Sequence, residues 1–321
     1  MADIPHFTLN DGNKIPSIGI GCWMGVPGGA ERVYNMCLKA LKNGYRLIDT
    51  ANGYGNEKQV GQAVRDSGIP REDIYVTTKL PSNDHHRVQE SFDESLQSLG
   101  LDYIDLYLMH WPQACISAVS MADPDAVIPP PRGSPTFIET WRDMEKLLAT
   151  GKVRSIGISN FSVKTLNELL PHCQVVPAVN QVELHPCLPS IDLKKLCDDK
   201  GILLEAYSPL GQKTTLLHES PIIREIGDRL GATPAQVVLS WDVQRGTAVV
   251  AKTETESRMT ENTTIVQLSE ADMEALNGMH KLPGLHRSLV WVRDTDEVFG
   301  WKYEWLGWEI GRGGLVSGGI V

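Results

Sequence analysis

The feature that most constrains the fold is a regular alternation of short apolar segments with longer amphipathic ones. Apolar side chains recur at helical spacing in the longer segments, as in Val88, Phe92, Leu96 and Leu99, and again in Phe137, Trp141, Met144 and Leu148. Parallel strands need a crossover connection, so this alternation predicts a parallel sheet. The eight segments that we interpret as strands are Ser17–Gly21, Tyr45–Asp49, Ile74–Lys79, Tyr103–Met109, Val153–Ile158, Ala178–Val182, Ile202–Tyr207 and Thr247–Val250.

Turn and cap residues agree with this division. Helical runs end at Gly44, Gly100, Gly151 and Gly246, where a left-handed residue closes a helix. Thr233 before Pro234 is typical of a helix start, and Ser162 and Ser190 are candidate N-caps. Eight strand–helix units predict the α/β class and a (β/α)8 TIM barrel. We expect a single domain over residues 1–321, with the barrel at about 17–279 and a tail at about 280–321.

Two segments fall outside the alternation. Pro112–Pro135 is a long loop after the fourth strand, and the tail carries Trp291, Trp301, Trp305 and Trp308 before a glycine-rich end. Loops at the strand-exit side of a barrel usually shape a substrate pocket, so we expect the tail to lie over the barrel mouth. The stretch after Gly311 fits either order or disorder.

Composition excludes several classes of protein. The formal net charge is −10, which disfavours binding to nucleic acid or to anionic membranes. No apolar run is long enough to span a membrane, and residues 1–10 lack the pattern of a secretory signal. The six cysteines are scattered without Cys-x-x-Cys pairs, which predicts neither a metal site nor a redox dithiol. We therefore expect a cytoplasmic protein, monomeric or weakly dimeric.

Reactive side chains stand at the ends of three consecutive strands. Asp49 ends the second strand, Tyr54 follows it in a loop, Lys79 ends the third, and His110 follows the fourth. Active sites of parallel barrels lie at this face. An ammonium beside a phenol lowers the phenol's pKa, so Tyr54 is expected to donate a proton to a carbonyl oxygen. Each residue alone also fits a structural role; the combination favours chemistry.

The chain resembles the aldo-keto reductases from about Ile4 to about Leu276. The resemblance implies that Tyr54 is the general acid, that Asp49 and Lys79 tune it, and that His110 orients the carbonyl. The overall look is closest to fungal glycerol dehydrogenases and aldehyde or xylose reductases. The motifs that carry it are residues 44–50 (GYRLIDT), 54–57 (YGNE), 101–112 (LDYIDLYLMHWP), 157–161 (GISNF), 180–186 (NQVELHP) and 206–211 (AYSPLG).

The resemblance also implies a nicotinamide cofactor, although no Gly-x-Gly-x-x-Gly motif joins a strand to a helix. In the family the cofactor lies extended across the barrel mouth. The matching positions imply that Ser159, Asn160 and Gln181 hold the carboxamide and that Tyr207 stacks on the nicotinamide, with Ser208 and Leu210 nearby. Lys252, Thr253 and Arg258 match the residues that bind the 2′-phosphate, and Asn262 matches an adenine contact.

These positions predict NADP(H) rather than NAD(H). Two acidic residues oppose that prediction. Glu254 and Glu256 add negative charge beside the proposed phosphate site, and an acidic side chain can instead accept the ribose hydroxyls of NAD. The family also usually has proline where Ala251 stands. The cofactor preference is thus open to test at the segment that follows the eighth strand.

The substrate is expected to be a small carbonyl compound or, in reverse, a polyol such as glycerol. Trp23, Trp111 and Trp301 are the expected pocket residues, and Pro81 replaces a tryptophan that relatives often have. His110 argues against steroid double-bond reduction, for which relatives place glutamate there. Two alternatives stay open, namely a cofactor-binding regulatory subunit without turnover and a metal-dependent hydrolase, for which Asp49 and His110 supply too few ligands.

Overall fold

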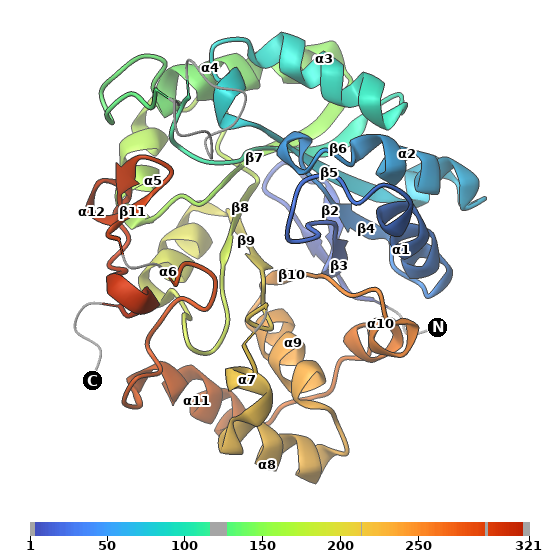
Figure 1. The fold of residues 1–321 in the computed structure, drawn as a ribbon, viewed down its shortest axis with the longest axis vertical. Coiled ribbons are helices and arrows are strands. Elements are labelled where there is room, and N and C mark those ends of the chain that lie inside the picture. The colour runs from blue at the N-terminus through green and yellow to red at the C-terminus, as the bar shows by residue number, and fades with distance from the viewer. Residues whose placement is uncertain (1–3, 116–126, 213, 293–294, 317–321) are drawn as a thin grey trace.

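Eight parallel strands form a closed barrel in the order β10-β3-β4-β5-β6-β7-β8-β9, and helices surround it (Figure 1). The computed structural model describes residues 4–115, 127–212, 214–292 and 295–316. The predicted TIM barrel is confirmed, and every predicted strand agrees with the structure within two residues at each end. The barrel strands are β3 Ile18–Gly21, β4 Leu47–Asp49, β5 Tyr75–Leu80, β6 Ile104–Met109, β7 Val153–Ser159, β8 Val179–Glu183, β9 Leu203–Tyr207 and β10 Ala248–Ala251.

Helices cover the outside of the barrel and bury apolar faces against it. They are α1 Ala30–Lys42, α2 Glu57–Asp66, α3 Val88–Leu99, α4 Phe137–Leu147, α5 Val163–Leu169, α6 Ile191–Lys200, α7 Leu216–Glu219, α8 Pro221–Leu230, α9 Pro234–Gln244, α10 Glu256–Asn262 and α11 Glu270–Gly278, and the tail adds α12 Tyr303–Leu306. Thr233 and Ser162 cap α9 and α5 through their side chains, as predicted. Ser190 also stands at the N-cap position of α6, as predicted, but it adopts a left-handed conformation (φ 46°) and its side chain makes no cap bond.

The four glycines predicted to end helices all adopt the left-handed conformation. Their φ angles are 94° for Gly44, 62° for Gly100, 68° for Gly151 and 73° for Gly246. Gly19 has a different reason to be glycine, because a Cβ there would lie 2.5 Å from Cγ of Leu47 on the neighbouring strand. Gly19 is therefore required by the packing of β3 against β4.

A short antiparallel hairpin, β1 (His6–Thr8) and β2 (Lys14–Pro16), precedes the barrel and was not predicted. Leu9 and Ile15 from this hairpin pack with barrel side chains such as Leu47 and Val179. These barrel residues stand near the amino ends of their strands, so the hairpin closes that end of the barrel. The opposite end carries the polar residues of the candidate site.

The tail lies across the carboxyl ends of the strands, as predicted. Figure 1 shows α12 and β11 beside α5, and the Ser162 hydroxyl at the start of α5 donates to the Leu306 carbonyl at 2.6 Å. The tail contains a second hairpin, β11 Glu297–Val298 and β12 Trp301–Lys302. Residues 311–316 pair back onto the tail through the bridges Arg287–Leu315 and Ile310–Val316, while residues 317–321 lie outside the described part.

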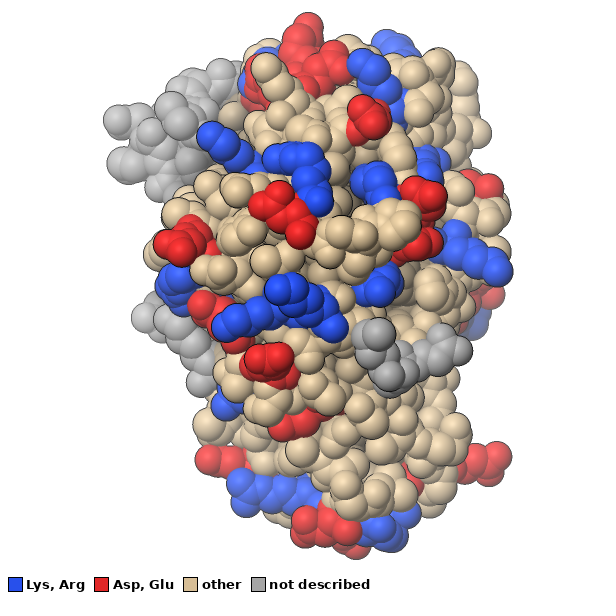
Figure 2. Space-filling view, turned by 90° about the vertical axis from the view of Figure 1, so that its right-hand side faces the viewer, with Lys and Arg blue, Asp and Glu red and all other residues tan. Residues whose placement is uncertain are grey.

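Charges of both signs intermingle on the surface. On the face in Figure 2, Lys and Arg side chains lie among Asp and Glu side chains, so any binding site for an anion must be argued residue by residue. Within the described residues, no helix combines the length and the apolar character that crossing a bilayer requires.

Candidate active site

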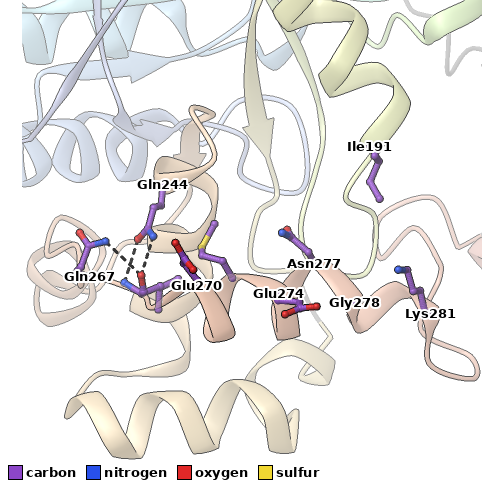
Figure 3. A pocket seen from close by; sticks show the side chains of 10 residues that line it. Ile191, Gln244, Gln267, Glu270, Glu274, Asn277, Gly278 and Lys281 are labelled. Atoms are coloured by element: carbon purple, nitrogen blue, oxygen red, sulfur yellow. Dashed lines mark hydrogen bonds between the residues drawn. The ribbon is translucent and has the colours of Figure 1, made fainter.

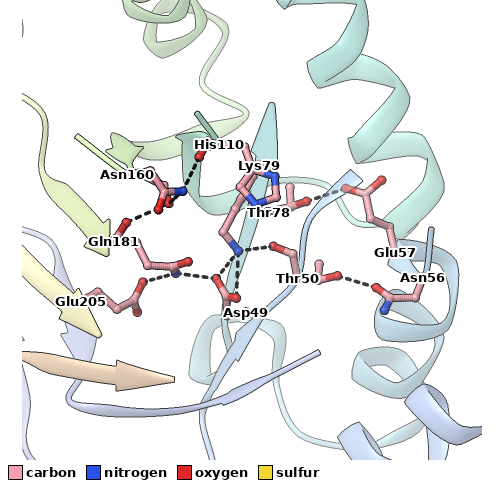
Figure 4. Close-up of polar contacts among 11 residues, drawn as sticks. Asp49, Thr50, Asn56, Glu57, Thr78, Lys79, His110, Asn160, Gln181 and Glu205 are labelled. Atoms are coloured by element: carbon pink, nitrogen blue, oxygen red, sulfur yellow. Dashed lines mark hydrogen bonds and ion pairs between the residues drawn. The ribbon is translucent and has the colours of Figure 1, made fainter. Parts of the chain in front are cut away.

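A buried ion pair forms the floor of the site. Lys79 in β5 is fully buried, and its Nζ lies 2.8 and 2.7 Å from the two carboxylate oxygens of Asp49 at the end of β4 (Figure 4). Nζ also donates to the Thr50 carbonyl at 2.8 Å. Burial is the largest single influence on the pKa of Lys79 and lowers it, but the charge and hydrogen bonds of Asp49, together with the charges of Tyr54 and Glu205, outweigh burial, so the pKa of Lys79 is raised. The ammonium is therefore held both in place and in its charged form.

The loop after β4 brings Tyr54 to this ammonium. Tyr54 ends a single 3-10 turn, Asn52–Tyr54, and its carbonyl accepts from the Gly28 amide at 2.7 Å. Asn56 fixes the loop from the other side, because it accepts from the Thr50 hydroxyl at 2.6 Å and donates to the Cys22 carbonyl at 2.9 Å. Nζ of Lys79 lies 5.1 Å from the centre of the Tyr54 ring.

Burial is the largest influence on the pKa of Tyr54. It raises the pKa of Tyr54 to about 12, although the charge and the hydrogen bond of Lys79 pull in the opposite direction. The expectation of a lowered pKa was therefore wrong for the protein without ligand. Lys79 does favour the phenolate, as argued, but the desolvation of the ring is the larger effect.

Two aromatic rings flank Tyr54. The ring centre of Trp23 lies 5.1 Å away and that of His110, directly after β6, lies 5.6 Å away. Burial, followed by the charge of Lys79, lowers the pKa of His110 well below its usual value. His110 is thus neutral at physiological pH, and one ring nitrogen keeps a proton that it can donate to a ligand oxygen.

The residues expected around a nicotinamide form one hydrogen-bonded network at the ends of β7, β8 and β9. The Asn160 amide donates to the His110 carbonyl at 2.9 Å, and the Ser159 hydroxyl donates to the Gln181 carbonyl at 2.8 Å. The Tyr207 hydroxyl donates to Oδ1 of Asn160 at 2.9 Å. The network connects this group directly to His110 and so to the rings beside Tyr54.

The segment after β10 carries a charge network. Lys252 donates to Glu254 at 2.6 Å, and Arg32 in α1 binds the same carboxylate through Nε and an Nη at 3.0 and 2.8 Å. Arg32 and then Lys252 lower the pKa of Glu254 to about 2. Arg258 in α10 is exposed, whereas Thr253 and Asn262 are buried. Glu254 is therefore ionised and partly neutralises the cations expected to bind a phosphate.

The tail contributes an aromatic wall. The rings of Trp111, Trp291 and Phe299 pack edge to face, with centres 5.2 to 5.7 Å apart. Nε1 of Trp308 donates to the Asn160 carbonyl at 3.3 Å, so the tail also touches the network of polar residues. Trp301 is buried elsewhere in the tail, where its indole N–H donates to the Pro129 carbonyl at 2.7 Å.

One carboxylate binds several groups of the tail. Glu183, at the end of β8, accepts from the Ser288 hydroxyl at 2.6 Å and from the Leu289 and Val290 amides at 2.7 and 3.2 Å. Its Oε1 also lies 2.9 Å from Nε2 of His185. These contacts hold the start of the tail directly before Trp291.

Two hollows differ in their relation to this site. A small cavity of about 20 Å³ lies between the tail and the strand ends and is lined by residues that include Tyr207, Trp291 and Trp308. A wider hollow of about 820 Å³ opens on the outside of the barrel between α9, α11 and the start of α6 (Figure 3). It contains Gln244, Glu274 and Lys281 but none of the candidate catalytic residues, so we assign it no part in the chemistry.

Comparison with known proteins decides the family. The model of the Aldo/keto reductase family matches residues 17–281. This chain belongs to the aldo/keto reductase family. It is 45% identical over 291 residues to "Glycerol 2-dehydrogenase (NADP(+))" of Saccharomyces cerevisiae, covering 87% of this chain and 92% of that one. It is 41% identical over 278 residues to "D-galacturonate reductase" of Hypocrea jecorina, covering 84% and 89%.

Solved structures agree. A crystal structure of an aldo-keto reductase complexed with NADPH superposes with a TM-score of 0.79 at 34% identity and covers 86% of this chain and 88% of that one. The aldose reductase of Schistosoma japonicum superposes with a TM-score of 0.78 at 36% identity, covering 85% and 91%. This aldo/keto reductase is accordingly an oxidoreductase, and carbonyl reduction is the chemistry of its family.

The site of this aldo/keto reductase fits a nicotinamide cofactor by the chemistry of its side chains. The Asn160 amide lies beside Tyr207, whose hydroxyl donates to it, and the Gln181 amide nitrogen donates to Asp49 and Glu205. Lys252 and Arg258 are exposed cations. Ser208 and Leu210 are half-buried just beyond Tyr207, and the Ser208 hydroxyl accepts from Gln212 at 3.1 Å. Glu254 is a carboxylate in the segment after β10 that opposes the expected phosphate site, and it is held by Lys252 and Arg32.

The structure brings some predicted residues together and separates another. Asp49, Tyr54, Lys79 and His110 meet, and Trp23 and Trp111 lie beside them or beside the tail. Trp301 does not join the aromatic wall, and Trp291 and Phe299 take that place. Aromatic residues in the tail were the available signal, but the sequence does not say which of them turn inward. Gln181 has an unexpected partner, Glu205, which is described below.

Proposed function

We propose that this protein reduces an aldehyde or ketone to the alcohol with NADPH, and that Tyr54 is the general acid. The observation that carries the proposal is the ammonium of Lys79, held by Asp49 and lying 5.1 Å from the centre of the Tyr54 ring. A charged donor fixed beside a phenol favours loss of the phenol's proton. The same residues serve alcohol oxidation in reverse.

NADPH, when bound, supplies the hydride that adds to the carbonyl carbon. Tyr54 donates its hydroxyl proton to the carbonyl oxygen, and Lys79 stabilises the phenolate that remains. Because burial raises the pKa of Tyr54 to about 12, the free protein keeps this proton at neutral pH. Neutral His110 orients the substrate by donating a hydrogen bond to its oxygen.

The cofactor preference is proposed to be NADP(H) over NAD(H). Ser159, Asn160 and Gln181 would hold the carboxamide, and the Tyr207 ring would support the nicotinamide face. Lys252 and Arg258 would bind the 2′-phosphate, with Thr253 and Asn262 beside them. Arg32 supports this assignment because its paired hydrogen bonds to Glu254 offset the charge that opposes a phosphate.

The substrate is proposed to be a small aldehyde or a sugar-like carbonyl compound, or a polyol such as glycerol in reverse. The names of the yeast and Hypocrea relatives, a glycerol dehydrogenase and a galacturonate reductase, support this class. Trp23 and Trp111 provide apolar faces that pack against the CH groups of such substrates.

The test is a panel of carbonyl compounds and polyols assayed with NADPH and NADH by loss or gain of reduced-nicotinamide absorbance. Turnover of glyceraldehyde or a pentose with NADPH, abolished in Tyr54→Phe, is the expected result. If the protein binds NADPH but turns over no member of the panel, the catalytic proposal fails and a cofactor-binding role replaces it.

A further inference from the structure

A second carboxyl group is buried inside the barrel below the candidate site. Glu205 lies in the middle of β9, has no exposed surface and pairs in register with Gln181 of β8. Nε2 of Gln181 lies 2.6 Å from Oε2 of Glu205 and 2.8 Å from Oδ2 of Asp49 (Figure 4). The other oxygen of Glu205, Oε1, has no hydrogen-bond partner in the described residues.

The chemistry of an amide makes this bridge specific. A primary amide has two N–H groups, and here each is directed at one carboxyl group. The reverse orientation would set the amide oxygen against two carboxyl oxygens. Gln181 therefore ties Glu205 to Asp49, and Asp49 in turn holds Lys79 through both oxygens. The chain of contacts runs from Glu205 to the ammonium beside Tyr54.

We propose that Glu205 is a positioning residue for the proton-donating group, fixing Asp49 and Lys79 through Gln181 and controlling the charge beneath them by gaining or losing its own proton. This inference rests on the function proposed above and deepens it. Glu205 does not reach the substrate, because Gln181 and Asp49 lie between it and Lys79.

The surroundings of Glu205 allow its proton to exchange near neutral pH. Burial, and then repulsion from Asp49, raise the pKa of Glu205 to about 7, while Gln181 and Lys79 lower it. Lys79 and Tyr75 face it from β5 and Asp49 from β4, and the charge of Glu205 contributes to the raised pKa of both Lys79 and Tyr75. β10, which pairs with the other side of β9, consists of Ala, Val, Val and Ala and brings no titratable group.

The sign of the effect follows from the charges. Above about pH 7 the ionised Glu205 adds a negative charge below Lys79, which disfavours the phenolate of Tyr54 and weakens the acid. Below that pH the charge is absent and Tyr54 releases its proton more easily. Carbonyl reduction should therefore speed up as pH falls through about 7 in the wild type.

The experiment compares the wild type with Glu205→Gln, which keeps the size of the side chain and removes its proton chemistry. The pH profile of carbonyl reduction by Glu205→Gln should lose the inflection near pH 7. The second readout is the tyrosinate absorbance of Tyr54 in the free protein, obtained by subtracting the signal of Tyr54→Phe. In Glu205→Gln this absorbance should titrate at a pH roughly half a unit or more lower than in the wild type. Glu205→Asp, which retains a carboxyl group, should retain an inflection.

Glu57→Gln is the matched control. Glu57 is also a buried carboxyl group beside β5, and it accepts from the Thr78 hydroxyl at 2.6 Å, but within the described residues it forms no hydrogen bond with Gln181 or Asp49. Because Glu57 also bonds Asn52 in the turn that carries Tyr54, the control is read on one feature alone: Glu57→Gln should keep the inflection near pH 7 that Glu205→Gln loses. The folded state of each variant is checked by thermal melting.

The outcomes separate this inference from the proposed function. If Tyr54→Phe loses activity but Glu205→Gln keeps both the inflection and the tyrosinate titration of the wild type, the role of Glu205 is refuted while the function stands. If Glu205→Gln fails to fold, the test rests on Glu205→Asp. A pH profile of Glu205→Asp without any inflection near neutral pH would overturn the proposal. If Tyr54→Phe keeps full activity, the proposed function fails first.

Discussion

The indole nitrogen of Trp291 donates a hydrogen bond to the hydroxyl of Tyr207, with 3.0 Å between the two atoms. Tyr207 passes a hydrogen bond on to Asn160, whose amide holds the His110 carbonyl. A residue of the tail is thereby connected to the group of polar side chains at the barrel mouth. The aromatic wall and the proposed nicotinamide site are thus one structural unit.

Trp291→Phe should weaken that unit while keeping an aromatic ring in the wall. The Tyr207 hydroxyl loses a donor, a change of about 1 kcal/mol, so we expect KM for the carbonyl substrate to rise about five-fold with a smaller effect on kcat. Steady-state kinetics measures both constants. Trp305→Phe is the control, because Trp305 in the same tail is 37% exposed. Equal changes in the two variants would contradict the role of Trp291.

Tyr54→Phe removes the proposed proton donor without changing the size of the ring. Turnover should fall about 100-fold or more, because general acid catalysis contributes at least that much. Binding of NADPH, followed by quenching of protein fluorescence, should stay close to that of the wild type. A variant that loses turnover only because it no longer binds NADPH would show that Tyr54 has a binding role instead.

Arg258→Ala should weaken the binding of NADPH far more than the binding of NADH. A charge-assisted hydrogen bond to a phosphate is worth about 1.5–3 kcal/mol, which corresponds to roughly a 10- to 150-fold loss in affinity. Titration of the free protein with each cofactor measures the two dissociation constants. Similar losses for both cofactors would place the 2′-phosphate away from Arg258.

Glu254→Gln should have the opposite effect on NADPH. Lys252 donates a hydrogen bond to the Glu254 carboxylate at 2.6 Å. Removing the charge of Glu254 leaves the Lys252 ammonium available to a phosphate, so we expect NADPH to bind several-fold more tightly. Glu256→Gln serves as the control, since the Glu256 carboxylate accepts a long hydrogen bond from Asn43 at 3.5 Å and, among the described residues, binds no cation. A selective loss of NADH affinity in Glu254→Gln would instead indicate that Glu254 accepts ribose hydroxyls.

Asp242→Asn should stabilise the protein at alkaline pH. Asp242 is fully buried in α9, its carboxyl oxygens have no hydrogen-bond partner in the described residues, and burial raises its pKa well above the usual value. The folded state therefore holds a proton that the unfolded chain releases above about pH 4, so this carboxyl costs stability progressively as pH rises from there. The variant should melt about 2 °C or more higher at pH 8, and the difference should shrink toward pH 4. A constant difference across this range would contradict a buried, protonated Asp242.

The barrel could be predicted because its signals are local and repeated. Each strand and each helix carries its own periodicity, and the carboxyl ends of parallel strands always meet at one face, so Asp49, Lys79 and His110 could be placed together without coordinates. The hairpins β1–β2 and β11–β12 have strands of two or three residues, too short for any period to show.

What could not be predicted depends on contacts across the barrel or on the path of irregular chain. The bond between Gln181 and Glu205 follows from strand register, which the sequence does not display. The pKa of Tyr54 depends on how completely neighbouring loops exclude water from it. The choice of Trp291 over Trp301 for the aromatic wall depends on the course of the tail, which has no repeating pattern to guide a prediction.

Because the tail is attached at Glu183, the residues that shape the substrate entrance lie on a different part of the chain from the proposed reacting groups. The proposed reacting groups lie on β4 and β5, in the loop after β4 and directly after β6. Trp291 and Phe299, in contrast, follow a segment whose hydroxyl and amides bind Glu183 of β8. Substitutions in that segment can reshape the aromatic wall without touching Tyr54, the proposed proton donor. Selectivity can accordingly diverge among descendants of such a chain while the underlying reaction is inherited unchanged.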